Sequence, residues 1–363
     1  MLSFRTHLII ASVMGISITT SGCRDINIAQ LDVENSPPAS DPVDPAAPSE
    51  PSSVIFEDNF EKYGAWSTAS DNVSHTYPSS NASMLGGPCD YTTGLPCWYS
   101  WSQGAGSNGL APPLFRINDA SSKSGSQALT CNYEYSQYIN GGSMDLVLTN
   151  GRTTGYDDIW YQAWLYIPDD FDPETASGGY VNPWKVLHSN TGVNIATESP
   201  TSTWADSGLK RGMQQYFQVL VDGNGAYRLM MIYLHGPDDY VEHTIITPSS
   251  NNFARIKGKW SFVQWHIRLN TFTGSTPNND AVLDAWLIPG DELHTYDVTK
   301  PTLSFFNAAP GYLITDPARR TNALIVFGNM NPHLVSTTKQ VDMSIDDLVV
   351  STKPLGPGYV IGN

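Results

Sequence analysis

The segment 259–271 constrains this chain most, because its residues alternate between apolar and polar. It reads K-W-S-F-V-Q-W-H-I-R-L-N-T. Successive side chains of an extended strand point to opposite faces. One face therefore carries Val263, Trp265, Ile267 and Leu269, and the other carries Gln264, His266, Arg268 and Asn270. The apolar face belongs in a core. The polar face is either an ordinary solvated strand face or a surface that binds a polar polymer.

The same alternation recurs along the chain, and no heptad pattern or internal repeat accompanies it. Strands are predicted at 54–61, 124–133, 159–167, 184–190, 215–221, 226–235, 282–288, 323–327 and 343–351. In 159–167 the predicted inward residues are Tyr161, Ala163 and Leu165. The D-G-N-G between 215–221 and 226–235 predicts a β-hairpin. Many strands joined by Gly and Pro turns predict an all-β fold, either a sandwich or a jelly roll.

The first 53 residues differ in composition from the rest. Arg5 and His7 precede an apolar run at 8–18, and T-S-G-C ends at Cys23. This resembles a bacterial lipoprotein signal, which predicts a signal peptide at 1–22 and lipidation of Cys23. The run is too short to span a bilayer, for which about 20 residues are needed. Residues 23–53, rich in Pro, Ser and Asp, are predicted to form a disordered tether before a folded domain at 54–363. We expect an exported protein, either a lipoprotein of the bacterial outer membrane or cell surface, or a secreted one.

Charge and cysteine content restrict the partners and the covalent links. The formal net charge of -16 argues against nucleic acid, whose phosphates need a basic surface. Cys89 and Cys97 bracket a short turn-rich segment and are the predicted disulfide of an exported domain. Cys131 is then a buried thiol, although pairing with either of the other two stays open.

Several motifs together indicate a family. They are F-E-D-N-F-E at 56–61, S-G-S-Q-A-L at 124–129, the 259–271 strand, A-V-L-D-A-W at 281–286 and I-D-D-L-V-V-S-T-K-P-L-G at 345–356. The combination resembles the concanavalin A-like jelly-roll domains, and within them the polysaccharide lyases of the alginate, glucuronan and heparin lyase I type. The resemblance implies two curved antiparallel sheets, with an acidic, uronate-containing polysaccharide cleaved by β-elimination in the concave groove of one sheet. A noncatalytic cell-surface carbohydrate-binding protein and a glycoside hydrolase of the same fold are the alternatives.

A lyase of this kind needs three groups: one that neutralises the uronate carboxylate, a base for the C5 proton and an acid for the leaving oxygen. The candidate base is His188 or His266, the candidate acid is Tyr233, and Gln264 with Arg268 would hold the carboxylate. For either histidine a hydrogen-bonded structural role is the alternative. Sugar rings stack on flat apolar faces, and their hydroxyls need polar partners. The predicted substrate-binding residues are Lys185, Trp160, Gln162, Trp164, Trp184, His235 and Trp286.

No catalytic cofactor is expected. Asn59 and Asp346 resemble positions that hold a structural calcium ion in this superfamily, and a polar pair at strand ends is the equal alternative. The expected partners are the polysaccharide and, through the lipid, a membrane, and the protein is expected to be a monomer.

Overall fold

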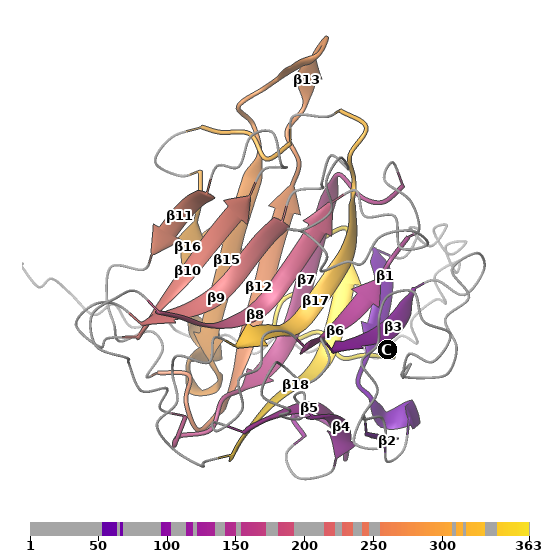
Figure 1. The fold of residues 1–363 in the computed structure, drawn as a ribbon, viewed down its shortest axis with the longest axis vertical. Coiled ribbons are helices and arrows are strands. Elements are labelled where there is room, and N and C mark those ends of the chain that lie inside the picture. Colours follow the sequence, from indigo (N-terminus) through magenta and orange to yellow (C-terminus); the bar gives the residue numbers. More distant parts are fainter. Residues whose placement is uncertain are drawn as a thin grey trace, which may run out of the picture. The chain divides into compact units, whose positions relative to one another are not determined.

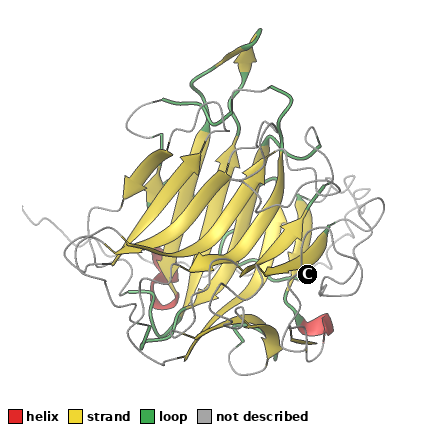
Figure 2. Ribbon diagram, viewed as in Figure 1, coloured by secondary structure: helices red, strands yellow, loops and turns green. Residues whose placement is uncertain are grey.

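A computed structural model describes most of the strands of this chain. The described residues are 53–63, 66–67, 96–102, 114–118, 122–134, 142–149, 154–171, 181–191, 214–221, 227–234, 242–246, 255–306, 310–314, 317–330 and 340–362. They lie within one compact unit, Pro51–Asn363. Two antiparallel sheets make up this unit (Figures 1 and 2).

The first sheet, called sheet A here, contains the strand that the sequence singled out. Its strand order is β16-β15-β12-β7-β18-β5-β4-β2, and β1 pairs with β18. The bounds are β1 Val54–Asp58, β2 Trp66–Ser67, β4 Leu114–Asn118, β5 Ala128–Glu134, β7 Asp158–Tyr166, β12 Trp260–Arg268, β15 Val282–Pro289, β16 Leu303–Ser304 and β18 Gln340–Ser351. β7 lies between β12 and β18, so strands far apart in the sequence are neighbours in the sheet.

The second sheet, sheet B, has the order β11-β10-β9-β8-β17-β6-β3. Its strands are β3 Cys97–Ser102, β6 Gly142–Val147, β8 Val181–Thr191, β9 Gln214–Val221, β10 Tyr227–Leu234, β11 Glu242–Ile246 and β17 Thr321–Met330. β9 and β10 pair antiparallel with Val221 opposite Tyr227, which confirms the predicted hairpin pairing. A separate small hairpin joins β13 (Phe272–Thr273) to β14 (Thr276–Pro277).

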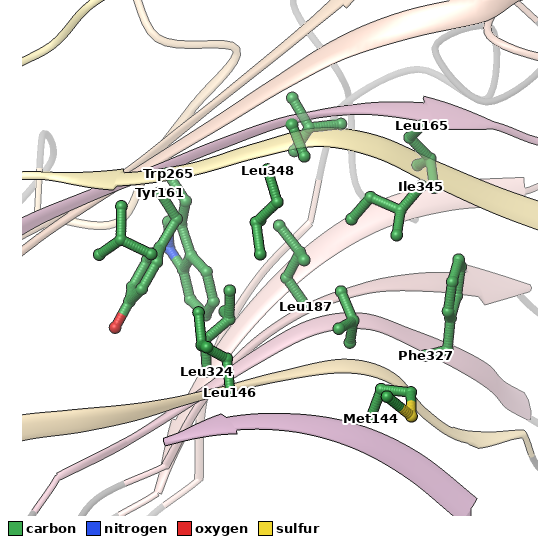
Figure 3. Packing of buried hydrophobic residues seen from close by; sticks show 14 of the residues in the cluster. Met144, Leu146, Tyr161, Leu165, Leu187, Trp265, Leu324, Phe327, Ile345 and Leu348 are labelled. Atoms are coloured by element: carbon green, nitrogen blue, oxygen red, sulfur yellow. The ribbon is translucent and has the colours of Figure 1, made fainter. Parts of the chain in front are cut away.

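The core lies between the two sheets. Tyr161, Leu165, Trp265, Ile345 and Leu348 enter it from sheet A, while Met144, Leu146, Leu187, Leu324 and Phe327 enter it from sheet B (Figure 3). The inward sides of β7 and β12 are those that the alternation predicts, because Tyr161, Ala163, Leu165, Val263, Trp265 and Ile267 all belong to the core cluster. Burying one face of each sheet against the other is what holds a sandwich together.

A buried carboxylate links the two sheets at one side of the core. Asp58, at the end of β1, accepts a hydrogen bond of 2.9 Å from the indole Nε1 of Trp98 on β3. It also accepts the Tyr63 hydroxyl and the Phe60 backbone N–H. Tyr63 lies in η1 (Glu61–Tyr63), and burial followed by the Asp58 charge raises its pKa far above the usual range. These hydrogen bonds to both oxygens of Asp58 offset the cost of burying its carboxylate.

The architecture confirms the predicted fold class, an all-β sandwich of the jelly-roll type. The helices in the described part of the chain are the short 3-10 turns η1 and η2 (Gly290–Thr295). Within those residues, no helix is long and apolar enough to cross a membrane.

Candidate active site

The outer face of sheet B is identified by the residues that face inward. On β8, Leu187 packs in the core, and the Ser189 hydroxyl donates to the Ala323 carbonyl and lies 3.3 Å from the hydroxyl of Tyr161, which belongs to sheet A. Successive positions of a strand alternate between faces. Position 188 therefore belongs to the face of sheet B that points away from the core.

Cross-strand register then shows which positions share that face with His188. His188 lies opposite Ile325 of β17 on one side and opposite Tyr216 of β9 on the other. Directly opposite residues share one face, with Cβ atoms about 4.5–5.5 Å apart. The register thus places an imidazole position beside a phenol position on β8 and β9, which are neighbours in the middle of sheet B (Figure 1).

Tyr233 is not on the same face as His188. It lies opposite Gln215, and Gln215 lies opposite Ser189. Because Ser189 faces the core, this row of positions belongs to the inner face. The tyrosine position that shares the face of His188 is therefore Tyr216 and not Tyr233.

Polar positions continue along the outer face on both sides of His188. Asn190 lies opposite Gln214, and Lys185 lies opposite Gln218. Trp184 lies opposite Val219, which falls on the inner row of β9 because it alternates with Gln218. Sequence reasoning missed Tyr216, Gln214 and Gln218. The signal was available in the alternation of Q-Q-Y-F-Q at 214–218, which puts the two amides and the phenol on one face.

His266, Gln264 and Arg268 lie on the other sheet. They occupy the outer face of β12, since Val263, Trp265 and Ile267 point into the core. The two sheets turn their outer faces in opposite directions. The five residues predicted to be catalytic are therefore not brought together: His188 lies on sheet B, and these three lie on the far side of sheet A.

His266 is almost fully buried and closely held. Its ring stacks on Trp160 with centroids 3.8 Å apart and planes 7° apart. Its Nε2 lies 2.8 Å from Oδ1 of Asp158 on β7. Asp284 lies opposite His266 on β15, and burial raises the pKa of Asp284 while its hydrogen bond with Ser304 and the nearby His266 and Arg268 lower it. These contacts fit the structural role that was the alternative for this histidine.

Gln264 and Gln162 are buried by segments that cover sheet A. The Tyr296 hydroxyl donates to Oε1 of Gln264 at 3.0 Å, and burial raises the pKa of Tyr296. Gln162 accepts from the Gly356 backbone N–H at 3.1 Å and donates to the Gly356 carbonyl at 3.4 Å. Neither amide is open to a polymer. Among the described residues, Nε2 of Gln264 has no hydrogen-bond partner.

The tryptophans of this face form a second small apolar cluster. Trp164 and Trp286 are 6% and 1% exposed and pack with Phe262 and Ile288. Trp160 is half-buried against them, with its ring on His266. Of the predicted sugar platforms on sheet A, only Trp160 keeps appreciable exposure. His235 lies outside the described residues.

Asn59 and Asp346 act as hydrogen-bond acceptors at strand ends. Asp346 is fully buried, and its oxygens accept backbone N–H groups of Lys123, Ser124 and Asp347 at 2.8–3.1 Å. Asn59 accepts the backbone N–H of Glu61 at 3.3 Å. Within the described ranges, no group of three His, Cys, Asp or Glu side chains could hold a metal. These contacts fit the polar strand-end pair, and the calcium site stays a prediction.

The cysteines are only partly within the described residues. Cys131 is buried in the core as a thiol. Cys97 begins β3, but Cys89 lies outside the described residues, so the pairing of Cys89 with Cys97 stays a prediction.

Comparison with known proteins finds similarity in the fold only. No family model matches the sequence, and no curated protein does. Solved structures to which the chain is similar include a mutant of the alginate lyase Aly36B bound to an alginate trisaccharide (TM-score 0.44, 13% identity, 80% of this chain and 98% of that one). A marine PL-14 alginate lyase from Aplysia kurodai also matches (TM-score 0.43, 11% identity, 66% and 87%), as does the receptor binding domain of botulinum neurotoxin D (TM-score 0.35, 11% identity, 73% and 46%).

Proposed function

We propose that the protein is a polysaccharide lyase that cleaves a uronate-containing polysaccharide on the outer face of sheet B. The observation that carries this proposal is the register of His188 opposite Tyr216. An imidazole and a phenol side by side can supply a base and an acid to one sugar unit. Amide positions in the neighbouring rows add donors for a carboxylate.

In the proposed reaction, His188 removes the C5 proton of the uronate and Tyr216 protonates the leaving oxygen on C4. The electrons of the C5–H bond form the C4–C5 double bond as the C4–O bond breaks. Asn190 and Gln214 lie opposite each other two positions along the strands, about 7 Å from the His188–Tyr216 row. There they would donate hydrogen bonds to the carboxylate and stabilise the negative charge that develops when C5 loses its proton.

The two roles fit groups that titrate on either side of neutrality. A neutral imidazole accepts a proton near pH 7, and a phenol keeps its proton well above that pH. Lys185, opposite Gln218, adds a cationic position to the same face of an otherwise acidic chain. This favours a polyanionic substrate over a neutral glucan.

The test measures the absorbance of unsaturated uronate on a panel of polymers that includes alginate and glucuronan. His188→Ala should lower the rate by about 100-fold or more, the usual effect of losing a general base. The matched control, His266→Ala on the other sheet, should retain the activity per folded molecule. If absorbance rises on none of the polymers, the lyase assignment is wrong. Polymer binding without cleavage would instead identify a carbohydrate-binding protein.

Export also belongs to this proposal, because a polysaccharide too large to enter a cell must be cut outside it. The expected lipidation of Cys23 would hold the enzyme at a membrane, with residues 23–53 as its tether.

A further inference from the structure

A hollow of about 300 Å³ lies at one end of sheet A, away from the outer face of sheet B. Its walls come from three parts of the chain that meet where β7 begins and β12 ends. Asp157 and Asp158 lie on the β7 side, Arg268 is the last residue of β12, and Phe272 and Pro317 supply apolar surface. The volume is at the small end of the range for ligand pockets and suits a single sugar ring.

The hollow is preformed, because Asn270 fixes two of its walls together. The Asn270 side-chain oxygen accepts the backbone N–H groups of Leu313 and Ile314, both at 2.8 Å. Its Nδ2 donates to the Ile314 carbonyl at 3.1 Å. Asn270 is itself buried, so this join between the end of β12 and the segment 313–314 is shielded from water. A preformed site loses little conformational entropy when it binds a ligand.

Most charges around the hollow already have partners. Asp157 pairs with Nε of Arg320 at 2.9 Å, and Arg320 also donates to the Pro317 and Arg319 carbonyls. Oδ1 of Asp158 lies within hydrogen-bond distance, 2.8 Å, of Nε2 of His266, so this contact uses one of its two oxygens. Both aspartates keep partly exposed side chains, 61% and 46%, which leaves carboxylate oxygen available to sugar hydroxyls.

Arg268 differs from these residues in that no carboxylate of the described residues forms a direct ion pair with it, although its charge acts on the nearby carboxylates of Asp280 and Asp284. Its side chain is exposed, and its hydrogen bond within the described residues is a single one of 3.3 Å to the Asp280 carbonyl. The Asp280 carboxylate instead accepts hydrogen bonds from the backbone N–H and the hydroxyl of Thr271. A guanidinium has five N–H donors in a planar fork that matches a carboxylate. Most of that fork is therefore available at the edge of the hollow.

We infer that this hollow is a second saccharide site that takes one uronate unit, with its carboxylate on Arg268. The apolar face of the sugar ring would lie on Phe272 and Pro317, and its hydroxyls would donate to Asp157 and Asp158. The choice of a uronate over another small carboxylate rests on the proposed function. The site itself belongs to sheet A and is separate from the His188 face. An oligosaccharide that binds here is therefore held without being cleaved.

A site-specific experiment tests this inference separately from the lyase activity. NMR follows the side-chain Nε–H resonance of Arg268 while glucuronate is added. The resonance is assigned by its absence from the spectrum of Arg268→Lys. A second titration uses glucose, the neutral counterpart of glucuronate. Glucuronate should shift the resonance with a dissociation constant of about 1 mM, an affinity suited to so small a ligand. Glucose should cause at most a tenth of that shift at equal concentration.

Variants test the assigned contacts. Arg268→Gln should weaken glucuronate binding at least tenfold when binding is followed through other pocket resonances, because the bidentate contact is lost. The control Arg255→Gln removes an exposed arginine that pairs with Glu292 elsewhere on the molecule, and it should leave binding unchanged. An Arg268 resonance that does not move up to about 100 mM glucuronate, or that moves equally with glucose, would overturn the inference. Because the signal is local to Arg268, inactivity on every polymer would refute the lyase without affecting this result.

Discussion

His266 stacks on Trp160 with ring centroids 3.8 Å apart, and its Nε2 lies 2.8 Å from Asp158. One face of the His266 ring thus contacts Trp160 and one ring nitrogen contacts Asp158, and both neighbours lie on β7. A histidine held in this way joins β12 to β7 through side chains as well as through the backbone ladder. It is positioned to stabilise sheet A.

His266→Ala should therefore lower the free energy of unfolding by about 1–3 kcal/mol, from the lost stacking and the lost hydrogen bond. Urea unfolding followed by tryptophan fluorescence would measure this. His266→Phe retains the ring but not the hydrogen bond, and it should fall between the wild type and the alanine variant. If neither variant changes the unfolding midpoint, the structural role is wrong.

The two tyrosines of the β9–β10 hairpin give a paired prediction. Tyr216→Phe should reduce lyase activity about 100-fold or more with little effect on folding, because it removes the proposed acid from the outer face. Tyr233→Phe, at the inner row, should leave the rate on polymer within a fewfold of the wild type. Initial rates of absorbance increase, corrected for folded protein, distinguish the two. The reverse order of effects would assign the acid role to Tyr233.

Removing the buried charge at Asp58 should be costly. Asp58→Ala leaves the Trp98 indole N–H, the Tyr63 hydroxyl and the Phe60 N–H without their acceptor. A loss of about 3–5 kcal/mol is expected for breaking a buried network of this kind. The control is Asp342→Ala, whose exposed carboxylate pairs with Arg116 and should contribute less than about 1 kcal/mol. Thermal or urea unfolding of the two variants would show the contrast, and similar losses for both would contradict it.

Asp346 predicts a dependence of stability on pH. Burial raises its pKa from 3.8 to about 7, despite the backbone N–H groups that lower it. The folded protein then holds this proton to a higher pH than the unfolded chain does. The stabilisation is complete below about pH 4 and is lost as the pH rises through about 7.

This dependence is tested by comparing the wild type with Asp346→Asn, which does not titrate. Their free energies of unfolding are measured in urea at pH 4.5, 6 and 8. In the difference between the two proteins, the contributions of the other titrating groups cancel. The stability of the wild type relative to the variant should decrease from the lowest to the highest pH. A difference that stays constant with pH would show that Asp346 does not titrate in this range.

Lipidation at Cys23 is tested by mass spectrometry of the protein purified from its own membranes. An N-terminal peptide that begins at Cys23 and carries acyl chains is expected, and Cys23→Ser should lack this mass and leave the membrane fraction. The same unacylated N-terminus in both proteins would rule out the anchor.

Local sequence was sufficient to assign faces to single strands. The alternation in 259–271 put Val263, Trp265 and Ile267 in the core, and the structure places them there. The D-G-N-G turn predicted the β9–β10 pair in the same way. Both inferences hold because the two-residue period of a strand is a local property of its backbone.

Only the tertiary structure decided which polar residues lie on the same face of the same sheet. His188 and His266 both lie within strands that have apolar inner faces, and no local pattern tells which sheet a strand joins. The burial of Trp286 by packing against its neighbours and of Gln162 by Gly356 likewise depends on segments distant in sequence. The chain's own pattern therefore determined the sandwich and the inward sides of β7 and β12. The pairing of His188 with Tyr216, and the separation of both from His266, arise from strand order and register, which long-range packing sets.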